Sequence, residues 1–397
     1  MKKGTAIPVL MYHSVGRPIK GWYPPWFSVP AAVFADHLEW LAKTGYKSVT
    51  LDELYAHVSG DATLPPKSVV LTLDDGYLDN WTYVVPLLAR YGFTGTVFVT
   101  PEFVDPRDVV RTTLEDTGDD AMHDDRLDVN GFMSWNELRA AVDRNIFSVE
   151  CHALTHTWYP TGPDIVDFHH PGDAYYWLDW NTHPADKPFY LEHLGESKIP
   201  WGTPVYAHGK SLEVTRYFPD PEEAERLTRF VAKEGGEEFF QRDGWRDTLR
   251  SELERIRKGR PPRGRHETPD ERRERYTEEL VDSKRRIEER LGSDVRYLVF
   301  PGGGYNDESF ELARSMFKAV TAGRPERFAL FNRPGEDPGK ISRRGTQLLT
   351  TGNRGFYPGG AYLVDYLREY QGSTFARRRR QVRKLIHLAG MRIGIQR

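Results

Sequence analysis

Two adjacent carboxylates follow a strongly apolar segment near residue 70. Residues 69–73 (Val-Val-Leu-Thr-Leu) lack polar alternation and predict a buried strand, which places Asp74 and Asp75 at its carboxyl end. Open α/β sheets and barrels carry their functional sites at that end. Asp-Asp-Gly is also typical of a simple turn. The pair therefore indicates a functional site only if other functional residues in the chain accompany it.

A histidine pair is the second feature that could take part in a reaction. His152 and His156 lie four residues apart, directly after another predicted buried strand. On a helical turn this spacing puts both imidazoles on one side, although such pairs also occur by chance. One carboxylate and two imidazoles leave open coordination positions on a divalent metal, which is typical of a catalytic site. The second carboxylate can then accept a proton from water during attack on a carbonyl.

The segments that would position these side chains alternate between strands and helices. This order predicts a parallel sheet or barrel. A capping box at Ser134 and Glu137 marks the start of one helix. Strands are expected at 7–12, 46–50, 69–73, 95–100, 146–150 and 295–300, and helices at 30–45, 51–60, 78–92, 134–145 and 272–292.

Residues 157–270 interrupt the alternation. The segment is aromatic and rich in Pro and Gly to about residue 218, then helical and charged. A βα connection normally spans a few residues, so we expect a functional insertion within one domain at 1–371. It should pack over the carboxyl ends of the strands and shape a groove. Its aromatic rings suit sugar faces, and the lining candidates are Tyr175, Tyr176, Trp177 and Trp180.

Composition narrows the function classes. The 397 residues are 39% hydrophobic and 28% charged, which is typical of a globular protein. A net charge of -3 gives no reason to expect a nucleic-acid partner. The single cysteine, Cys151, excludes an internal disulfide and is most simply a buried core residue. The apolar run near the N-terminus is too short for a signal peptide or membrane span. A cytoplasmic location is therefore expected, with secretion or a periplasmic location left open.

Three motifs stand in the order "LTLDDGYLDN" (71–80), "CHALTH" (151–156) and "YLVFPGGGYND" (297–307), after an opening strand "VLMYHSV" (9–15). Together they resemble the polysaccharide deacetylases, the NodB-type or family 4 carbohydrate esterases, in which the three motifs occur in the same order. The similarity is to the branch that acts on poly-N-acetylglucosamine, which opens with a similar Met-Tyr-His strand, and it covers about 7–156 and 275–345. The resemblance implies a bacterial protein with a distorted (β/α) barrel and a long insertion between the second and third motifs. It also implies a metal-dependent hydrolase that removes N-acetyl groups from amino sugars of a polysaccharide, oligosaccharide or glycolipid-linked glycan.

The resemblance also implies residue roles. Asp74 is expected to be the general base and the backbone N–H of Tyr77 the oxyanion donor. The expected ligands of a divalent metal are Asp75, His152 and His156. Zn²⁺ is the expected ion, with Co²⁺ or Ni²⁺ as alternatives. Pro301 and Gly302 match the loop that forms a wall of the site.

Two departures from the family pattern leave roles open. The third motif usually has an arginine before its proline and an aromatic residue after it, where this chain has Phe300 and Gly302. Arg343 or Arg344 can supply the missing arginine, and Arg344 is placed with the substrate-binding candidates. The family's late histidine, a general acid, is not recognisable. His208 is the first candidate for the acid, His170 is another, and His13 is a candidate for both the acid and a substrate contact. Each is more simply interpreted as a packed or surface histidine.

Other functions remain open. A sugar-binding protein that has lost turnover would explain the missing arginine and acid. A related hydrolase acting on a small cyclic or linear amide is a further alternative. The expected partner in the leading interpretation is an N-acetylated glycan.

The C-terminal residues 372–397 form a basic tail without acidic residues. Five apolar positions fall on one helical face, which predicts an amphipathic helix against an anionic membrane surface. Such a helix would hold the protein peripherally at the inner membrane face, and the alternative is a frayed basic terminus. The five positions are Val382, Leu385, Ile386, Ala389 and Ile393.

Overall fold

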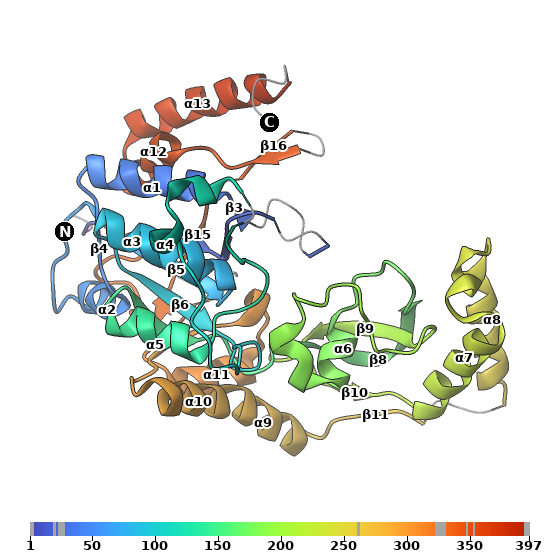
Figure 1. Ribbon diagram of the computed structural model, residues 1–397. Coiled ribbons are helices and arrows are strands. Elements are labelled where there is room, and N and C mark those ends of the chain that lie inside the picture. Colours follow the sequence, from blue (N-terminus) through green and yellow to red (C-terminus); the bar gives the residue numbers. More distant parts are fainter. Residues whose placement is uncertain are drawn as a thin grey trace.

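A nine-stranded, entirely parallel sheet forms the centre of the computed structural model (Figure 1). Its strands are β1 (Val9–Tyr12), β4 (Lys47–Ser48), β5 (Ser68–Asp75), β6 (Gly95–Val99), β7 (Phe147–Cys151), β12 (Tyr297–Val299), β13 (Ala319–Thr321), β14 (Lys340–Ile341) and β15 (Arg344–Gly345). The structure describes residues 4–18, 21–22, 28–124, 126–259, 263–321, 331–346, 348–351 and 354–392.

The strand order shows that this sheet curves into a barrel. It runs β14-β13-β12-β7-β6-β5-β1-β15, with β4 beside β5. The two end strands are consecutive in the chain, and three Cα steps join Ile341 to Arg344, a span of at most about 11 Å. If the eight strands of this order lay in a flat sheet, the two end strands would be about 34 Å apart. The sheet must therefore curve round on itself. The expected distorted (β/α) barrel is confirmed.

Side-chain alternation gives the barrel an inner and an outer core. Alternate residues Val9, Val70, Phe98, Val299 and Ile341 form one cluster, which α2 (Leu51–Ser59) joins. A hydrogen bond from the Tyr297 hydroxyl to Asp52 places α2 at the amino ends of the strands. The opposite, carboxyl ends of the strands are left for the site.

Helices cover the outer face and pack on the intervening residues such as Leu71 and Val97. The capping box at Ser134 and Glu137 is present as predicted, since each side chain bonds the other's backbone N–H. The expected helix at 78–92 begins with a π-turn (Asn80–Val84) just before Pro86, which lacks a backbone donor. The principal covering helices are α1 (Ala31–Lys43), α3 (Val85–Tyr91), α5 (Trp135–Asp143), α10 (Ser283–Leu291) and α11 (Asp307–Met316).

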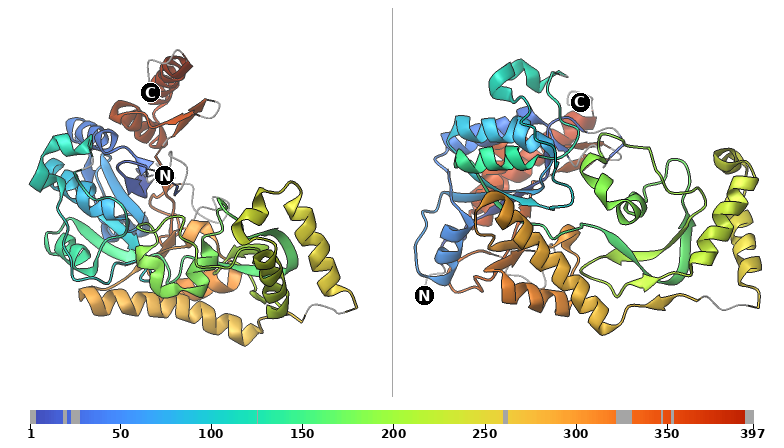
Figure 2. Two further views of the ribbon diagram at one scale, coloured as in Figure 1. Left: turned by 45° about the vertical axis from the view of Figure 1, so that its right-hand side comes forward. Right: turned by 60° about the horizontal axis from the view of Figure 1, so that its bottom comes forward.

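Residues 158–266 form a lobe to the side of the barrel (Figure 1). Its elements are β8 (Trp158–Phe168), α6 (Trp177–Thr182), β9 (Pro204–Lys210), β10 (Tyr217–Phe218), α7 (Pro221–Lys233), α8 (Trp245–Arg257) and β11 (Arg265–His266). The long hairpin of β8 and β9 begins next to the carboxyl ends of the barrel strands, and α9 (Pro269–Thr277) leads the chain back (Figure 2). Only the first half of the insertion lies near the predicted site. Helices α7 and α8 project away from it and have their own apolar cluster around Leu227 and Leu249.

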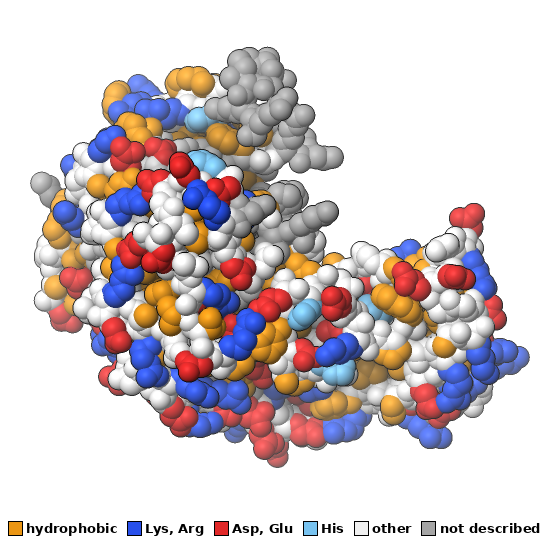
Figure 3. Space-filling model, viewed as in Figure 1, with side chains coloured by type: hydrophobic (Ala, Val, Ile, Leu, Met, Phe, Trp, Pro, Cys, Tyr) orange, Lys and Arg blue, Asp and Glu red, His pale blue; other side chains and the backbone are white. Residues whose placement is uncertain are grey.

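The C-terminal residues form two packed helices, α12 (Gly360–Tyr370) and α13 (Thr374–Arg392). Helix α12 packs against α1, and α13 against α12. In the described part of the chain, none of the helices combines the length and the hydropathy needed to span a bilayer. These helices lie at the top of the space-filling view (Figure 3).

Candidate active site

The structure brings Asp75, His152 and His156 together at the carboxyl ends of β5 and β7. The Asp75 Oδ1 atom lies 3.3 Å from His152 Nε2 and 3.4 Å from His156 Nε2. One donor atom from each residue lies within 4.8 Å of the others, and no other group of three in the described ranges meets this condition. The three side chains are at most 10% exposed. Their spacing and donor types fit a divalent metal with three protein ligands.

The protonation states also suit metal binding. The Val299 carbonyl accepts a 2.8 Å hydrogen bond from His152 Nδ1, which leaves the Nε2 lone pair directed at the cluster. Burial lowers the pKa of His156 to about 3, despite the opposing charge of Asp75. Burial alone would raise the pKa of Asp75, but His152 and His156 lower it well below its ordinary value. Neutral His156 and ionised Asp75 are the forms that bind a cation.

Left-handed backbone conformations concentrate at this cluster. Asp75 has φ 70°, Ala153 φ 57° and His156 φ 48°, and they are three of the four non-glycine residues with positive φ in the described ranges. Each such residue costs about 1–3 kcal/mol and persists where its surroundings enforce it, which is common at functional sites. The expectation of a helical turn for the histidine pair is therefore wrong, because residues 152–157 form an irregular loop.

A buried carboxylate on a neighbouring helical segment holds this loop. The Glu279 carboxylate accepts hydrogen bonds of 3.0 Å from the backbone N–H groups of Leu154 and Thr155. It also accepts one from the Thr155 hydroxyl. Glu279 belongs to a π-helical turn (Glu278–Asp282) between α9 and α10. The chain that returns from the insertion therefore stabilises the loop that carries the two histidines.

Asp74 is held by an arginine from the last strand of the barrel. Arg343 Nη1 lies 2.6 Å from Asp74 Oδ1, and Nη2 lies 2.8 Å from Oδ2. Burial alone would raise the pKa of Asp74, but Arg343 outweighs this effect and lowers it. Thr72 and Asp74 continue the inward-facing series that begins at Val70, and Arg343 Nη1 also lies 3.3 Å from Thr72 Oγ1. Asp74 is thus ionised and fixed in direction.

The structure places Arg344 outside the site, so its prediction as a substrate-binding residue is wrong. Arg344 pairs in register with Leu10, whose side chain belongs to the outer core. Residues in register share a face, so Arg344 points outward and lies over the Tyr370 ring at 5.2 Å. Arg343 precedes it and points inward. The sequence offered both arginines, and only the strand register separates them.

Among the histidine candidates, His13 is the one that meets Asp74. His13 Nε2 lies 3.7 Å from Asp74 Oδ2, and its side chain is 24% exposed. Burial lowers the pKa of His13, against the attraction of Asp74 and Asp75. His208 instead packs on Trp177 with ring centroids 4.3 Å apart, and His170 lies by Arg246 in the lobe. The contacts of His208 in the described structure are thus with the lobe, at Trp177 and the Tyr206 carbonyl, and not with Asp74 or the metal-ligand candidates.

Tyr77, whose backbone N–H is the predicted oxyanion donor, lies two residues after Asp75. In the bridge between Tyr77 and Phe132, the flanking bonds run from Leu78 N to Gly131 O and from Met133 N to Gly76 O. This pattern directs the Tyr77 N–H away from Phe132. The buried Tyr77 ring stacks on Phe132, and its hydroxyl accepts a 3.0 Å hydrogen bond from Trp22 Nε1.

The predicted wall at Pro301 and Gly302 contacts a residue that sequence reasoning missed, Lys210 at the end of β9. Gly302 has φ 52°, and a Cβ there would lie 2.1 Å from Lys210 Nζ. Lys210 Nζ lies 4.2 Å from the centre of the Trp158 ring, and its charge contributes to the low pKa of His156. The lysine therefore occupies space that a larger residue at 302 would fill. No motif or spacing pointed to it.

The aromatic residues of the insertion divide into packed and cavity-lining groups. Trp177 and Trp180, predicted to contact substrate, are 8% and 2% exposed and pack in a cluster with Tyr77 and Phe103. Their rings stabilise the base of the hairpin, and little of either ring is exposed for contact with a sugar. Tyr175 and Tyr176, also predicted, do line a cavity.

Comparisons with known proteins agree with this fold. Residues 61–168 match the family model described as polysaccharide deacetylase. YxkH of Bacillus subtilis (strain 168), named for the same family, is 34% identical over 100 residues, 25% of this chain and 33% of the relative. The poly-beta-1,6-N-acetyl-D-glucosamine N-deacetylase of Escherichia coli (strain K12) is 26% identical over 131 residues, 33% of this chain and 18% of the relative. The chain thus spans a third or less of the length of these relatives.

A solved structure supports the fold over most of the chain. The BpsB deacetylase domain from Bordetella bronchiseptica superposes with a TM-score of 0.51 at 18% identity, covering 86% of this chain and 96% of that one. The family match spans the Asp74–Asp75 pair and both histidines, and the superposition extends over most of the chain. Residues 61–168 therefore match the polysaccharide deacetylase family, and the chain has the fold of a solved deacetylase domain.

Proposed function

We propose that the protein hydrolyses N-acetyl groups from amino sugars of a glycan with a divalent metal as cofactor. One observation carries the proposal. An ionised carboxylate, Asp74, is clamped by Arg343 directly beside the cluster of Asp75, His152 and His156. This arrangement places a base and a metal site side by side at the carboxyl ends of the strands, which hydrolysis of an unactivated amide needs.

The donor set favours particular ions. Two imidazoles and one carboxylate suit Zn²⁺, with Co²⁺ or Ni²⁺ as replacements. An ion held by Asp75, His152 and His156 would polarise the acetyl carbonyl and lower the pKa of water.

The residues around the cluster supply the proton transfers. Asp74 accepts the proton of the attacking water while Arg343 keeps both carboxylate oxygens oriented. The water oxygen forms a bond to the carbonyl carbon, and the Tyr77 N–H stabilises the negative charge that develops on the carbonyl oxygen. His13, 3.7 Å from Asp74, then passes the proton to the sugar nitrogen as the C–N bond breaks. The products are acetate and a free amino sugar.

The substrate class follows from the relatives and the site's surroundings. The Escherichia coli relative is named for poly-beta-1,6-N-acetyl-D-glucosamine, and the aromatic hairpin beside His156 suits a sugar chain. We expect the protein to release acetate from a β-1,6-linked N-acetylglucosamine oligomer at a far higher kcat/KM than from a small amide such as acetamide. Acetate assay of both substrates checks this. Binding of the oligomer without acetate release would favour the sugar-binding alternative, and preference for the small amide would favour the other hydrolase.

We also propose that α13 contacts an anionic membrane surface. Ion pairs from Arg380 to Glu369 and from Arg379 and Arg383 to Asp365 fix one face of α13 on α12. The opposite face exposes apolar side chains, and the top of Figure 3 shows apolar side chains beside basic ones. Lys384 is one of the exposed basic residues of α13. The exposed apolar residues are Phe375, Val382, Leu385 and Ile386, and Ala389 joins them, whereas Ile393 lies outside the described residues.

Replacing two of these apolar residues should weaken membrane binding. We expect Leu385→Gln/Ile386→Gln to reduce cosedimentation with anionic vesicles several-fold, because each buried CH₂ contributes about 0.8 kcal/mol. Val110→Gln/Val166→Gln removes two exposed valines elsewhere and should sediment like the wild type. The membrane contact would be contradicted if the tail variant bound anionic vesicles as well as the wild type does. It would also be contradicted if the wild type bound neutral vesicles at high salt as well as it binds anionic ones.

A further inference from the structure

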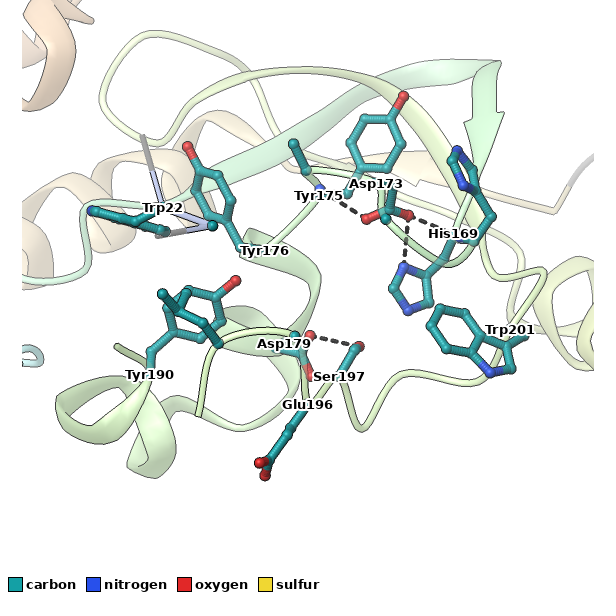
Figure 4. A pocket seen from close by; sticks show the side chains of 16 residues that line it. Trp22, His169, Asp173, Tyr175, Tyr176, Asp179, Tyr190, Glu196, Ser197 and Trp201 are labelled. Carbon is teal, nitrogen blue, oxygen red and sulfur yellow. Dashed lines mark hydrogen bonds and ion pairs between the residues drawn. The ribbon is translucent and has the colours of Figure 1, made fainter. Parts of the chain in front are cut away.

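A cavity of about 640 Å³ lies in the first half of the insertion (Figure 4). Its size is that of a small-molecule site, and the cluster of metal-ligand candidates is not among its lining residues. The walls come from the segment around His169, from α6, from residues 190–201 and from Trp22 in the N-terminal region.

Aromatic rings form two facing sides of this cavity. Trp22, Tyr176 and Tyr190 lie together on one side, with ring centroids 5.0 Å apart for Trp22–Tyr176 and 5.5 Å apart for Trp22–Tyr190. On the other side, Trp201 stacks on His169 at 4.6 Å (Figure 4). Flat apolar rings on two sides of a gap suit the C–H faces of a pyranose.

His169 contributes a buried acceptor without a partner. Its side chain is 5% exposed, and Nδ1 donates a 2.9 Å hydrogen bond to Asp173 Oδ2. Backbone N–H groups of His170 and Tyr175 fix the same carboxylate. The remaining ring nitrogen, Nε2, is buried and has no hydrogen-bond partner. An unsatisfied buried polar atom costs free energy, so a donor on a bound ligand would be stabilised there.

The charge around the cavity is negative. Asp173, Asp179 and Glu196 line it, and no Lys or Arg is among its described lining residues. Asp179 is held in place, since Oδ2 accepts a 2.7 Å bond from the Ser197 hydroxyl and Oδ1 a 2.9 Å bond from the Lys198 N–H. Acceptors and negative charge between aromatic faces favour a ligand that carries an ammonium group.

The cavity is adjacent to the metal cluster through a short series of rings. Tyr176 lies 5.8 Å from Trp158, and Trp158 lies 5.8 Å from the imidazole of His156. Trp22 bonds the hydroxyl of Tyr77, two residues after Asp75. One polymer chain can therefore occupy the cavity and the cluster through neighbouring units.

We infer that this cavity binds an amino-sugar unit whose acetyl group has already been removed. The inference rests on the proposed function, because an N-acetylated unit is neutral whereas its deacetylated product carries an ammonium group. The carboxylates and His169 Nε2 accept hydrogen bonds from the ammonium and hydroxyl groups, and the aromatic sides contact the ring faces. A partly deacetylated chain then binds in preference to an untouched one.

Calorimetric titration with a fully deacetylated glucosamine tetramer tests this site, since that probe cannot be turned over. Removing the two less buried charges with Asp179→Asn/Glu196→Gln should weaken its binding about tenfold, as expected for lost hydrogen bonds to a charged group. Trp201→Leu should also weaken it. The control Glu237→Gln/Asp243→Asn removes two exposed carboxylates outside the cavity and should bind like the wild type.

Three results would overturn the inference: no binding by the wild type, unchanged binding by the Asp179/Glu196 variant, or equal weakening in the control. A fully acetylated tetramer, titrated into Asp74→Asn to avoid turnover, should be insensitive to the Asp179 and Glu196 changes. Equal sensitivity would also contradict selection of the free amine. Acetate release is a separate readout, so binding without acetate release would reject the proposed function alone.

Discussion

Asp74→Asn should lower the rate of deacetylation by about 10²–10⁴ while the protein keeps its metal. The substitution removes the proton acceptor and leaves Asp75, His152 and His156 unchanged. Arg343 loses one of its two carboxylate contacts, so the amide is also held less firmly. Steady-state acetate release and metal content, measured on the same sample, distinguish loss of the base from loss of the metal.

Arg344→Lys is the matched control for this site. Arg344 is the direct neighbour of Arg343 but points to the outer core, so turnover of this variant should match the wild type. Arg343→Lys keeps the charge but loses the bidentate geometry, and should slow turnover without loss of metal. Normal turnover in Asp74→Asn would show that the base lies elsewhere, and His13 would be the next residue to change.

His156→Ala and Asp75→Ala should each lose the metal and the activity together. Either change leaves two of three protein ligands. The affinity for the metal should fall by more than roughly 10–100-fold, the loss that follows when only an outer partner of a ligand is changed. Atomic emission measures the metal-to-protein ratio after dialysis against a metal-free buffer.

His170→Ala provides the control for the ligand variants. His170 lies in the lobe beside Arg246, away from the cluster, and should keep full metal content. Full occupancy retained in His156→Ala would remove it from the ligand set. The variant His156→Gly also lacks the ligand, but glycine adopts φ 48° without strain. Its free energy of unfolding, compared with that of His156→Ala, therefore reports the backbone strain at this position.

The barrel and the convergence of its polar residues were predictable because they rest on local patterns. Apolar runs such as 69–73 identify buried strands without reference to the rest of the chain. The ends of parallel strands meet at one edge, which brings Asp74 and Asp75 near the histidine pair. The conformation of residues 152–157 was not predictable, since a spacing of four is equally compatible with a helical turn and with a loop held by Glu279.

Other features depend on register and on distant contacts. Arg343 and Arg344 are chemically identical neighbours, and the pairing of Arg344 with Leu10 alone decides which one faces inward. Lys210 reaches the site because a hairpin folds back from the insertion, and no local pattern records that return. Composition identified the aromatic residues of the insertion but could not separate the packed Trp177 from the cavity-lining Tyr176.

Acetate release from a β-1,6-linked N-acetylglucosamine oligomer, measured during metal removal and return, tests metal-dependent deacetylation most directly. The protein is stripped with a chelator, dialysed and titrated with Zn²⁺. We predict that activity disappears on stripping and returns in proportion to added ion, to a plateau at about one ion per chain, as one cluster of three ligands requires. Acetate release that persists in the stripped protein, or that never appears in the reloaded protein, would contradict the account.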